Sequence, residues 1–427
     1  LFTLLILLVN KKRTINYQNY LIELKKNYYL ILIIFITFFI FISAKSHGWD
    51  TFSFWLPRLD YLIENNQFPP RGFFRAEYPF SFELINYSVL SIIKFNVENI
   101  PSLLDCFLII MIFYIFVEEL HKEKIKKFQI PLYILIFFNP LILNTNTFSS
   151  YQDLKISFVI LLIVSFIYKK NIFLLNKVSL NNILILSSFN AILCVTKNIG
   201  VIYFTIISLY FLLVNIYHLK YKLLNNENIK KIIIYILISL SLYFFWRINL
   251  SLNNISSGPE FKGVRFEILK EFFSNFIGQI ILRKIYTVGL LIFLALFIFT
   301  FFLKKKILVK NTLSIIFFII FFWKLFLVIF ALGFQNYNHA IAAHNYWRYF
   351  SHLGPIILFG IFIFSVEFKK YFQNIKVNFL LIFFIFIICN FILIEKLRRD
   401  LIFPNYQLVE LIRNINFNSF DEKKIIY

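Results

Sequence analysis

The chain has 427 residues, of which 59% are hydrophobic and only 15% are charged. Soluble globular domains have about 45–50% apolar and about 25% charged residues, so this composition excludes an ordinary soluble protein and indicates a polytopic membrane protein. The net charge of +22 does not indicate nucleic-acid binding. The lysines fall in short clusters between apolar runs, the pattern that fixes the orientation of a membrane protein.

Apolar runs separated by lysine-rich or polar links predict an all-α, polytopic helical bundle with about eleven complete spans. The chain starts inside a shorter apolar run, Leu1–Val9, which is interpreted as a partial span whose beginning is truncated or misassigned, followed by a cytoplasmic link. In chain order the complete spans are Tyr28–Ser43, Ser102–Val117, Ile130–Leu143, Leu154–Tyr168, Ile183–Val195, Val201–Ile216, Ile232–Trp246, Tyr286–Phe302, Leu313–Phe330, Pro355–Phe364 and Phe379–Ile394.

The first outer segment, Ser46–Pro79, concentrates acids, arginines, aromatics and prolines. Within it, Thr51–Ile63 has apolar residues at helical spacing, so an amphipathic helix on the membrane surface is predicted. The next apolar segment, Glu83–Phe95, is short and is expected to be interfacial or re-entrant. Two further outer loops are predicted at Arg247–Lys284 and Gly333–Ser351. Any chemistry is expected on this outer face, because the outer segments carry most of the acids, histidines and glycines.

Two carboxylates stand at predicted outer boundaries of the membrane. Asp50 precedes an aromatic run, and Asp153 precedes a span that runs inward. A carboxylate at such a boundary is costly enough to indicate function. Capping of a helix N-terminus is the structural alternative for both residues.

Four cations also map to the outer face near span ends, where an anionic lipid phosphate would meet them. Ordinary snorkelling of long basic side chains is the alternative. These cations are Arg58, Arg75, Lys197 and Arg348.

Three histidines, His339, His344 and His352, share one outer loop. Their spacing is not that of a metal pair on one helix, so a metal site is disfavoured. The sequence leaves the use of a divalent cation open and indicates no other cofactor.

Six short motifs follow one another on predicted outer segments. They are Gly-Trp-Asp at 48–50, Trp-Leu-Pro-Arg at 55–58, Glu-Tyr-Pro-Phe at 77–80, Tyr-Gln-Asp-Leu at 151–154, Thr-Lys-Asn-Ile-Gly-Val at 196–201 and Tyr-Trp-Arg-Tyr at 346–349. In their order and placement, from about Ser43 to about Pro355, the chain resembles GT-C glycosyltransferases of the protein O-mannosyltransferase and aminoarabinose transferase type.

The resemblance implies an inverting transferase that takes a sugar from a polyprenyl phosphate at the outer leaflet. It implies that Asp50 is the catalytic carboxylate, Asp153 the second carboxylate, Lys197 the basic residue that follows the short span, and Arg348 a ligand of the donor phosphate. Arg58, Arg75, Glu77 and Tyr78 are expected to contribute to substrate binding. The expected partners are the polyprenyl-phosphate sugar, a glycolipid, glycan or protein acceptor, and membrane lipids.

The expected location is the inner membrane of a bacterium, with the site on the periplasmic face. The chain is then divided into a partial N-terminal span and link (1–27), a GT-C-like catalytic transmembrane domain (28–395) and a polar outer tail (396–427). Three alternatives stay open. A transporter or flippase for a lipid-linked sugar would bury charges at mid-span. An enzyme like O-antigen ligases or polymerases would use the late histidine-bearing loop, and a non-catalytic assembly subunit would carry a decayed site.

Overall fold

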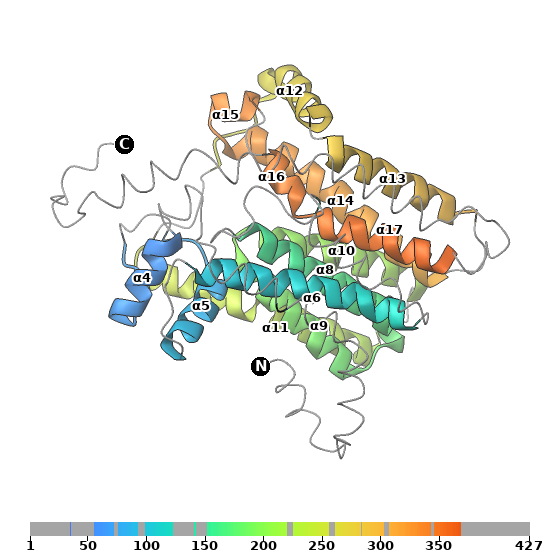
Figure 1. Cartoon of the computed structure of the whole chain (residues 1–427), viewed down its shortest axis with the longest axis horizontal. Coiled ribbons are helices and arrows are strands. Elements are labelled where there is room, and N and C mark those ends of the chain that lie inside the picture. The colour runs from blue at the N-terminus through green and yellow to red at the C-terminus, as the bar shows by residue number, and fades with distance from the viewer. Residues whose placement is uncertain are drawn as a thin grey trace, which may run out of the picture.

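The computed structural model describes residues 35, 55–71, 76–92, 99–122, 141, 152–219, 225–255, 261–282, 284–302, 307–342 and 346–368. Within these ranges the fold is all-helical and contains no strand, as predicted. Figure 1 shows the long helices running side by side along the long axis of the molecule, with short helices gathered towards one end. Of the predicted spans, Tyr28–Ser43, Ile130–Leu143 and Phe379–Ile394 lie outside these ranges, apart from single residues.

Five helical segments in the described part of the chain are long and apolar enough to cross a membrane. Because a helix rises about 1.5 Å per residue, about 20 residues cross the hydrocarbon layer. The five segments are Ile100–Glu118 in α6 (Ile100–Lys122), Gly200–His218 in α10 (Gly200–Leu219), Asn226–Leu252, which is α11, Ile307–Phe334, which is α14, and Tyr349–Glu367, which includes most of α17 (Gly354–Phe368).

Three further helices coincide with predicted spans but are shorter than the five candidate spans or carry more charge. α9 (Leu180–Thr196) contains a shorter apolar segment, as does α13 (Lys284–Thr300). α8 (Asp153–Lys170) is apolar in its middle but has Asp153 at its start and Lys169 and Lys170 in its last turn. This charge distribution matches the helix dipole, which favours acids at the N-terminus and bases at the C-terminus. Each of the three overlaps the span that the hydropathy pattern predicts.

The lysine-rich end of the bundle is ordered by local capping. α8 is followed by its C-cap Asn171, whose left-handed backbone (φ 52°) lets the next N–H, that of Ile172, bond back to the Ile167 carbonyl at 3.0 Å. The 3₁₀ helix η3 (Leu175–Lys177) follows, and the Ser179 hydroxyl then accepts from the Asn182 N–H to start α9. Asparagine tolerates this conformation and serine is a preferred N-cap. The link between α8 and α9 is therefore a short turn that specific hydrogen bonds hold in place.

The short helices α4 (Leu56–Asn65) and α5 (Ser81–Ile92) pack together at the other end of the bundle (Figure 1). α4 buries one stripe, which includes Leu59 and Leu62, and exposes acidic residues elsewhere. This is the amphipathic helix predicted in the first outer segment, and its described part starts at Leu56. α5 has 12 residues, which is too few to span a bilayer. Its length is consistent with the predicted interfacial helix.

The two late segments that were predicted as outer loops contain helices. α12 (Leu269–Leu282) lies inside Arg247–Lys284, and α15 (Tyr337–Ile341) and α16 (Tyr346–Ser351) lie inside Gly333–Ser351. α12 forms because Phe272 and Phe276 fall on one face and become buried. Phe276 packs against Phe350, so α12 covers α16.

Candidate active site

Asp153 is the first residue of α8 and is fully buried. The N-cap position belongs to Gln152, which makes no side-chain capping bond. Asp153 still lies in the first turn, where the helix dipole stabilises its negative charge. Burying a carboxylate is costly unless positive or hydrogen-bonding groups surround it, so its neighbours determine what it can do.

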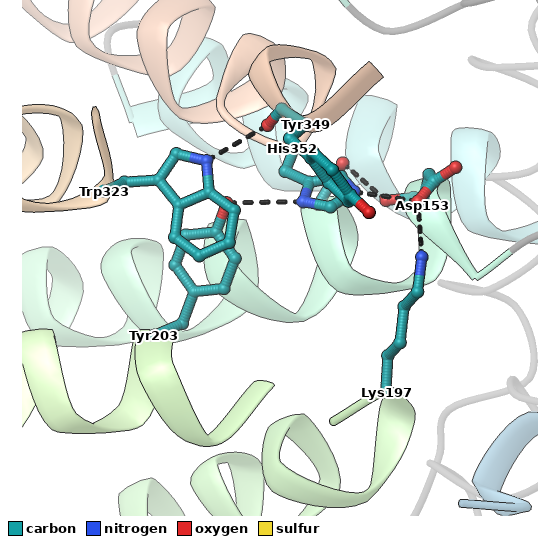
Figure 2. A network of polar contacts seen from close by, with 7 residues as sticks. Asp153, Lys197, Tyr203, Trp323, Tyr349 and His352 are labelled. Atoms are coloured by element: carbon teal, nitrogen blue, oxygen red, sulfur yellow. Dashed lines mark hydrogen bonds and ion pairs between the residues drawn. The ribbon is translucent and has the colours of Figure 1, made fainter. Parts of the chain in front are cut away.

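Two side chains from distant parts of the sequence meet the same oxygen of Asp153 (Figure 2). Lys197 Nζ lies 3.4 Å from Oδ1, and His352 Nε2 lies 2.8 Å from it. His352 is fully buried and Lys197 is 7% exposed. These contacts join α8 to the turn after α9 and to the short link that precedes α17. They make Asp153 the centre of a buried charged network.

The turn between α9 and α10 places Lys197. Its backbone is extended at the end of α9, and the Gly200 N–H donates to the Lys197 carbonyl at 2.7 Å. A Cβ at Gly200 would lie 1.8 Å from the Leu193 carbonyl oxygen. Only glycine fits this close approach, so the Lys-Asn-Ile-Gly sequence has a structural reason as well as a chemical one.

His352 bonds through both ring nitrogens. Its Nδ1 lies 3.3 Å from the Tyr203 hydroxyl, while Nε2 faces Asp153. An ionised carboxylate only accepts, so Nε2–H donates to Asp153, and Nδ1 of a neutral imidazole accepts from Tyr203. The Tyr203 ring stacks on Trp323 at 4.0 Å between centroids, and the Trp323 indole N–H donates to the Tyr349 carbonyl. The imidazole is therefore fixed in position.

A second polar group surrounds Arg58 and Glu83, on α4 and α5. The Arg58 guanidinium is fully buried, donates to the Tyr78 carbonyl at 2.6 Å, and lies 3.8 Å above the Phe80 ring. One of its nitrogens lies 3.8 Å from Glu83 Oε1. Gln152 donates to the other Glu83 oxygen at 3.3 Å. Because Gln152 precedes Asp153, this group adjoins the Asp153 network.

Burial dominates the ionisation of this pair. Desolvation raises the pKa of Glu83 to about 7, against the opposing attraction of Arg58. Desolvation also lowers the pKa of Arg58, against the charges of Glu83 and Glu77. Glu83 Oε1 has no hydrogen bond among the described residues. The pair is thus a buried and imperfectly satisfied ion pair.

A third pair fastens α8 to α6. Lys155 Nζ lies 2.5 Å from Asp105 Oδ1, and both side chains are fully or almost fully buried. Lys155 is the third residue of α8 and Asp105 the sixth of α6. The pair therefore lies near the same end of the bundle as Asp153 and not in the middle of either helix.

The structure brings together some of the predicted site residues. Asp153 and Lys197 are in contact, and Arg58 belongs to the adjoining group. Asp50 and Arg75 lie outside the described residues, as does the side chain of Arg348 on α16.

Glu77 and Tyr78 accept hydrogen bonds through their backbone carbonyls. The Glu77 carbonyl accepts from the Trp246 indole N–H at 3.3 Å, and the Tyr78 carbonyl accepts from Arg58. The Tyr78 ring stacks on Trp55. Arg58 is enclosed by protein groups, and its binding of a phosphate stays a prediction.

Sequence reasoning considered His352 as a disfavoured metal ligand and as part of the loop that an O-antigen-ligase-like enzyme would use, and it missed Tyr203, Glu83 and the Asp105–Lys155 pair. A signal for the pair existed, because an acid and a base in otherwise apolar helices need partners. Among the described residues no group of three His, Cys, Asp or Glu is arranged to hold a metal. The Lys197 ammonium contacts the same Asp153 oxygen as His352, and its positive charge also disfavours a metal cation between Asp153 and His352.

The arrangement can hold a lysine and an imidazole in fixed positions beside a buried carboxylate. Such preorganised charge is what stabilises a leaving group or orients a polar substrate. Family models and curated proteins provide no match to this chain.

Proposed function

We propose that the protein is a membrane glycosyltransferase of the GT-C type, which moves a sugar from a polyprenyl-phosphate donor to an acceptor on the outer face of the membrane. The observation that carries the proposal is the contact of Asp153 with Lys197 and His352 at one end of an apolar helical bundle. Asp153 and Lys197 come from two of the motifs that resemble this family. Their convergence supports a shared site.

The proposed topology has about eleven spans in the inner membrane of a bacterium, with the Asp153 end on the periplasmic side. The distribution of cations supports this orientation. Lys169, Lys170 and Lys177 lie at the far end of α8 and in the link after it. Cytoplasmic links carry an excess of Lys and Arg, so the Asp153 network belongs to the opposite, outer face.

In the proposed reaction the acceptor hydroxyl attacks the anomeric carbon of the donor. The bond between that carbon and the phosphate oxygen breaks, and the lipid phosphate leaves with the electron pair. Asp50 takes the acceptor proton as the new bond forms, the role of a general base. The configuration at the anomeric carbon is inverted, because the acceptor attacks the face opposite to the one from which the phosphate departs.

Asp153 has a different role in this proposal. It is enclosed, and its Oδ1 already receives Lys197 and His352. It therefore acts as a positioning residue that holds the Lys197 ammonium near the leaving phosphate. Arg75 and Arg348 supply further positive charge, since a guanidinium binds a phosphate by two parallel hydrogen bonds.

A transporter of lipid-linked sugars is the main alternative, and it would place buried charges at mid-span. The Asp105–Lys155 pair lies near helix ends, which favours the enzyme. Lys324, inside α14, is half-buried and lies 5.5 Å from the centre of the Phe350 ring. An aromatic contact of this kind stabilises a lone cation without a transport role.

An enzyme like the O-antigen ligases is the second candidate, and one observation favours it. His352, from the late outer segment, lies in the charged network and not on the surface. Both enzymes take a lipid-linked donor. They differ in the leaving group, which is a lipid monophosphate for the transferase and a lipid diphosphate for the ligase.

The test is a lipid extract from a strain that lacks this protein, complemented by wild-type or variant chains. We expect a polyprenyl monophosphate sugar to accumulate without the protein and to be consumed again with wild type. Asp50→Asn and Asp153→Asn should each nearly abolish consumption while the protein stays in the membrane. Glu64→Gln, on the exposed face of α4, is the control and should behave as wild type.

Three results would decide against the proposal. Full activity of Asp50→Asn removes the assigned base. Accumulation of a lipid diphosphate sugar supports the ligase. An unchanged total pool that is confined to the inner leaflet supports a transporter.

A further inference from the structure

A cavity of about 290 Å³ lies between α9, α10 and α11, on the lysine-rich side of the bundle. Its walls are almost entirely apolar and include Leu186, Leu209 and Ile232. α8 has 18 residues, so the link that closes the cavity lies about 27 Å from Asp153 along the helix axis. The cavity is therefore separate from the candidate active site.

The inner wall of the cavity is built from the link between α8 and α9. Asn215 on α10 accepts from the Leu175 N–H at 2.8 Å and donates to the Phe173 carbonyl at 3.2 Å. Lys231 on α11 donates to the Leu175 carbonyl at 3.2 Å. These bonds satisfy the backbone of a loop that turns apolar side chains into the cavity. The cavity is thus preformed and does not depend on a ligand to order its walls.

The cavity opens sideways. Thr205, Leu212 and Ile236 line it and are themselves exposed. α10 and α11 are candidate spans, so this opening faces the hydrocarbon layer. The Tyr235 hydroxyl at the wall is already bonded to Asn190 and Ser208. Such a cavity suits an apolar chain that enters from the membrane.

An exposed lysine adjoins the cavity at its inner end. Lys177 lies between two lining residues of the link, Leu175 and Val178. Lys231, by contrast, is occupied by Glu227 at 2.7 Å and by the link. Exposed lysines near a cytoplasmic membrane surface attract anionic lipid headgroups.

We propose that this cavity is a binding site for an anionic glycerophospholipid of the inner leaflet. One acyl chain fills the space beside Leu209, and the headgroup phosphate contacts Lys177. The proposal rests on the shape, lining, lateral opening and charged rim of the cavity. It is independent of the sugar chemistry, because the site lies at the opposite end of the bundle.

The test uses the full chain in phosphatidylcholine vesicles that contain phosphatidylglycerol with a photoactivatable diazirine in one acyl chain. After illumination, mass spectrometry maps the labelled residues. We expect labelling to concentrate on lining residues of α9, α10 and α11. Leu209→Trp fills the cavity, and it should reduce this labelling about tenfold, which corresponds to about 1.4 kcal/mol. Leu213→Trp, exposed on the same helix, is the matched control and should leave the labelling unchanged.

The charge of the rim is tested separately with Lys177→Gln. This change should lower labelling by phosphatidylglycerol about fivefold, since a lysine near an anionic surface contributes about 1 kcal/mol. Lys230→Gln, exposed on α11 and not a lining residue, is the control. These exposed positions keep the test decisive if Leu209→Trp fails to fold.

Two results overturn the proposal. Labelling spread evenly over exposed residues such as Leu237 and Phe245, and insensitive to Leu209→Trp, means ordinary boundary lipid. Equal labelling by a diazirine phosphatidylcholine, insensitive to Lys177→Gln, means that headgroup charge has no role.

Discussion

Glu83 allows the sharpest test of the buried charges at the Asp153 end of the bundle. In an unfolded chain its carboxyl loses the proton near the usual pKa of 4.5, whereas in the folded protein burial raises the pKa to about 7. Between these values the folded state binds more protons than the unfolded state. The contribution of Glu83 to stability is therefore largest below about pH 4.5 and is lost as the pH rises through 7.

Glu83→Gln removes this titration because an amide stays neutral. A difference in pKa from 4.5 to about 7 corresponds to about 3 kcal/mol when the titration is complete. Between pH 5 and pH 8 the unfolding free energy of Glu83→Gln, relative to wild type, should rise by about 2.5 kcal/mol. This change does not depend on the constant cost of replacing the carboxyl beside Arg58.

The measurement is equilibrium unfolding in mixed detergent and dodecyl sulfate micelles, followed by tryptophan fluorescence at pH 5 and pH 8. Glu64→Gln, which removes an exposed carboxyl from α4, serves as the control and should run parallel to wild type. An unfolding free energy that changes between pH 5 and pH 8 by the same amount in Glu83→Gln as in wild type would refute the raised pKa. A change of opposite sign would mean that attraction by Arg58 outweighs desolvation.

The remaining predictions concern the packing that supports the site. Asp105→Asn leaves Lys155 buried without its carboxylate and should cost about 3–5 kcal/mol in the same unfolding assay; Asp105→Leu with Lys155→Met should recover most of this loss, and no recovery would contradict the pairing. Gly200→Ala drives a Cβ into the Leu193 carbonyl and should cost about 1–3 kcal/mol while lowering activity through Lys197. Its control is Gly278→Ala on α12, where a Cβ meets nothing within 4 Å, and which should be neutral or slightly stabilising.

Much of the helical framework was predictable from hydropathy. Apolar runs bounded by lysines mark α6, α8, α9, α10 and α14, because a helix is the way for one segment in lipid to satisfy its own backbone. Helix ends were less predictable: α11 starts at Asn226 and not at Ile232, since the Asn225 side chain caps a first turn that is polar. Hydropathy does not detect such a turn.

The candidate site was only partly predictable for a related reason. Asp153 and Lys197 were selected because charged residues at membrane boundaries are costly and because their motifs resemble a family. That His352 binds Asp153 depends on how α8 and α17 pack, and 199 residues separate the two. Nothing local in sequence encodes that distance. Glu83 was overlooked because its helix was interpreted as an apolar interfacial segment.

The buried charges near Asp153 constrain how a lipid phosphate could bind. Within the described residues this end holds three buried acids and three buried bases, which are Glu83, Asp105, Asp153, Arg58, Lys155 and Lys197. Because these charges balance, they offer a phosphate no excess positive charge. In the proposed transferase, the Lys197 ammonium is already balanced by Asp153. The excess positive charge for the donor phosphate therefore comes from Arg75 and Arg348, or from Arg58 once Glu83 takes up a proton.

The two sources differ in their dependence on pH. If Arg58 contributes, affinity for a lipid phosphodiester rises as the pH falls through about 7, the pKa of Glu83, because protonation releases the guanidinium from its carboxylate. Methyl dodecyl phosphate is a suitable probe, since its single charge is constant over this range. Binding at pH 6 should be about tenfold tighter than at pH 8 for wild type, the contribution of one charge-assisted hydrogen bond. Glu83→Gln should bind equally at both values. A flat profile for wild type would assign the phosphate to Arg75 and Arg348 and leave Arg58 as a structural residue that anchors α4 to the backbone at Tyr78.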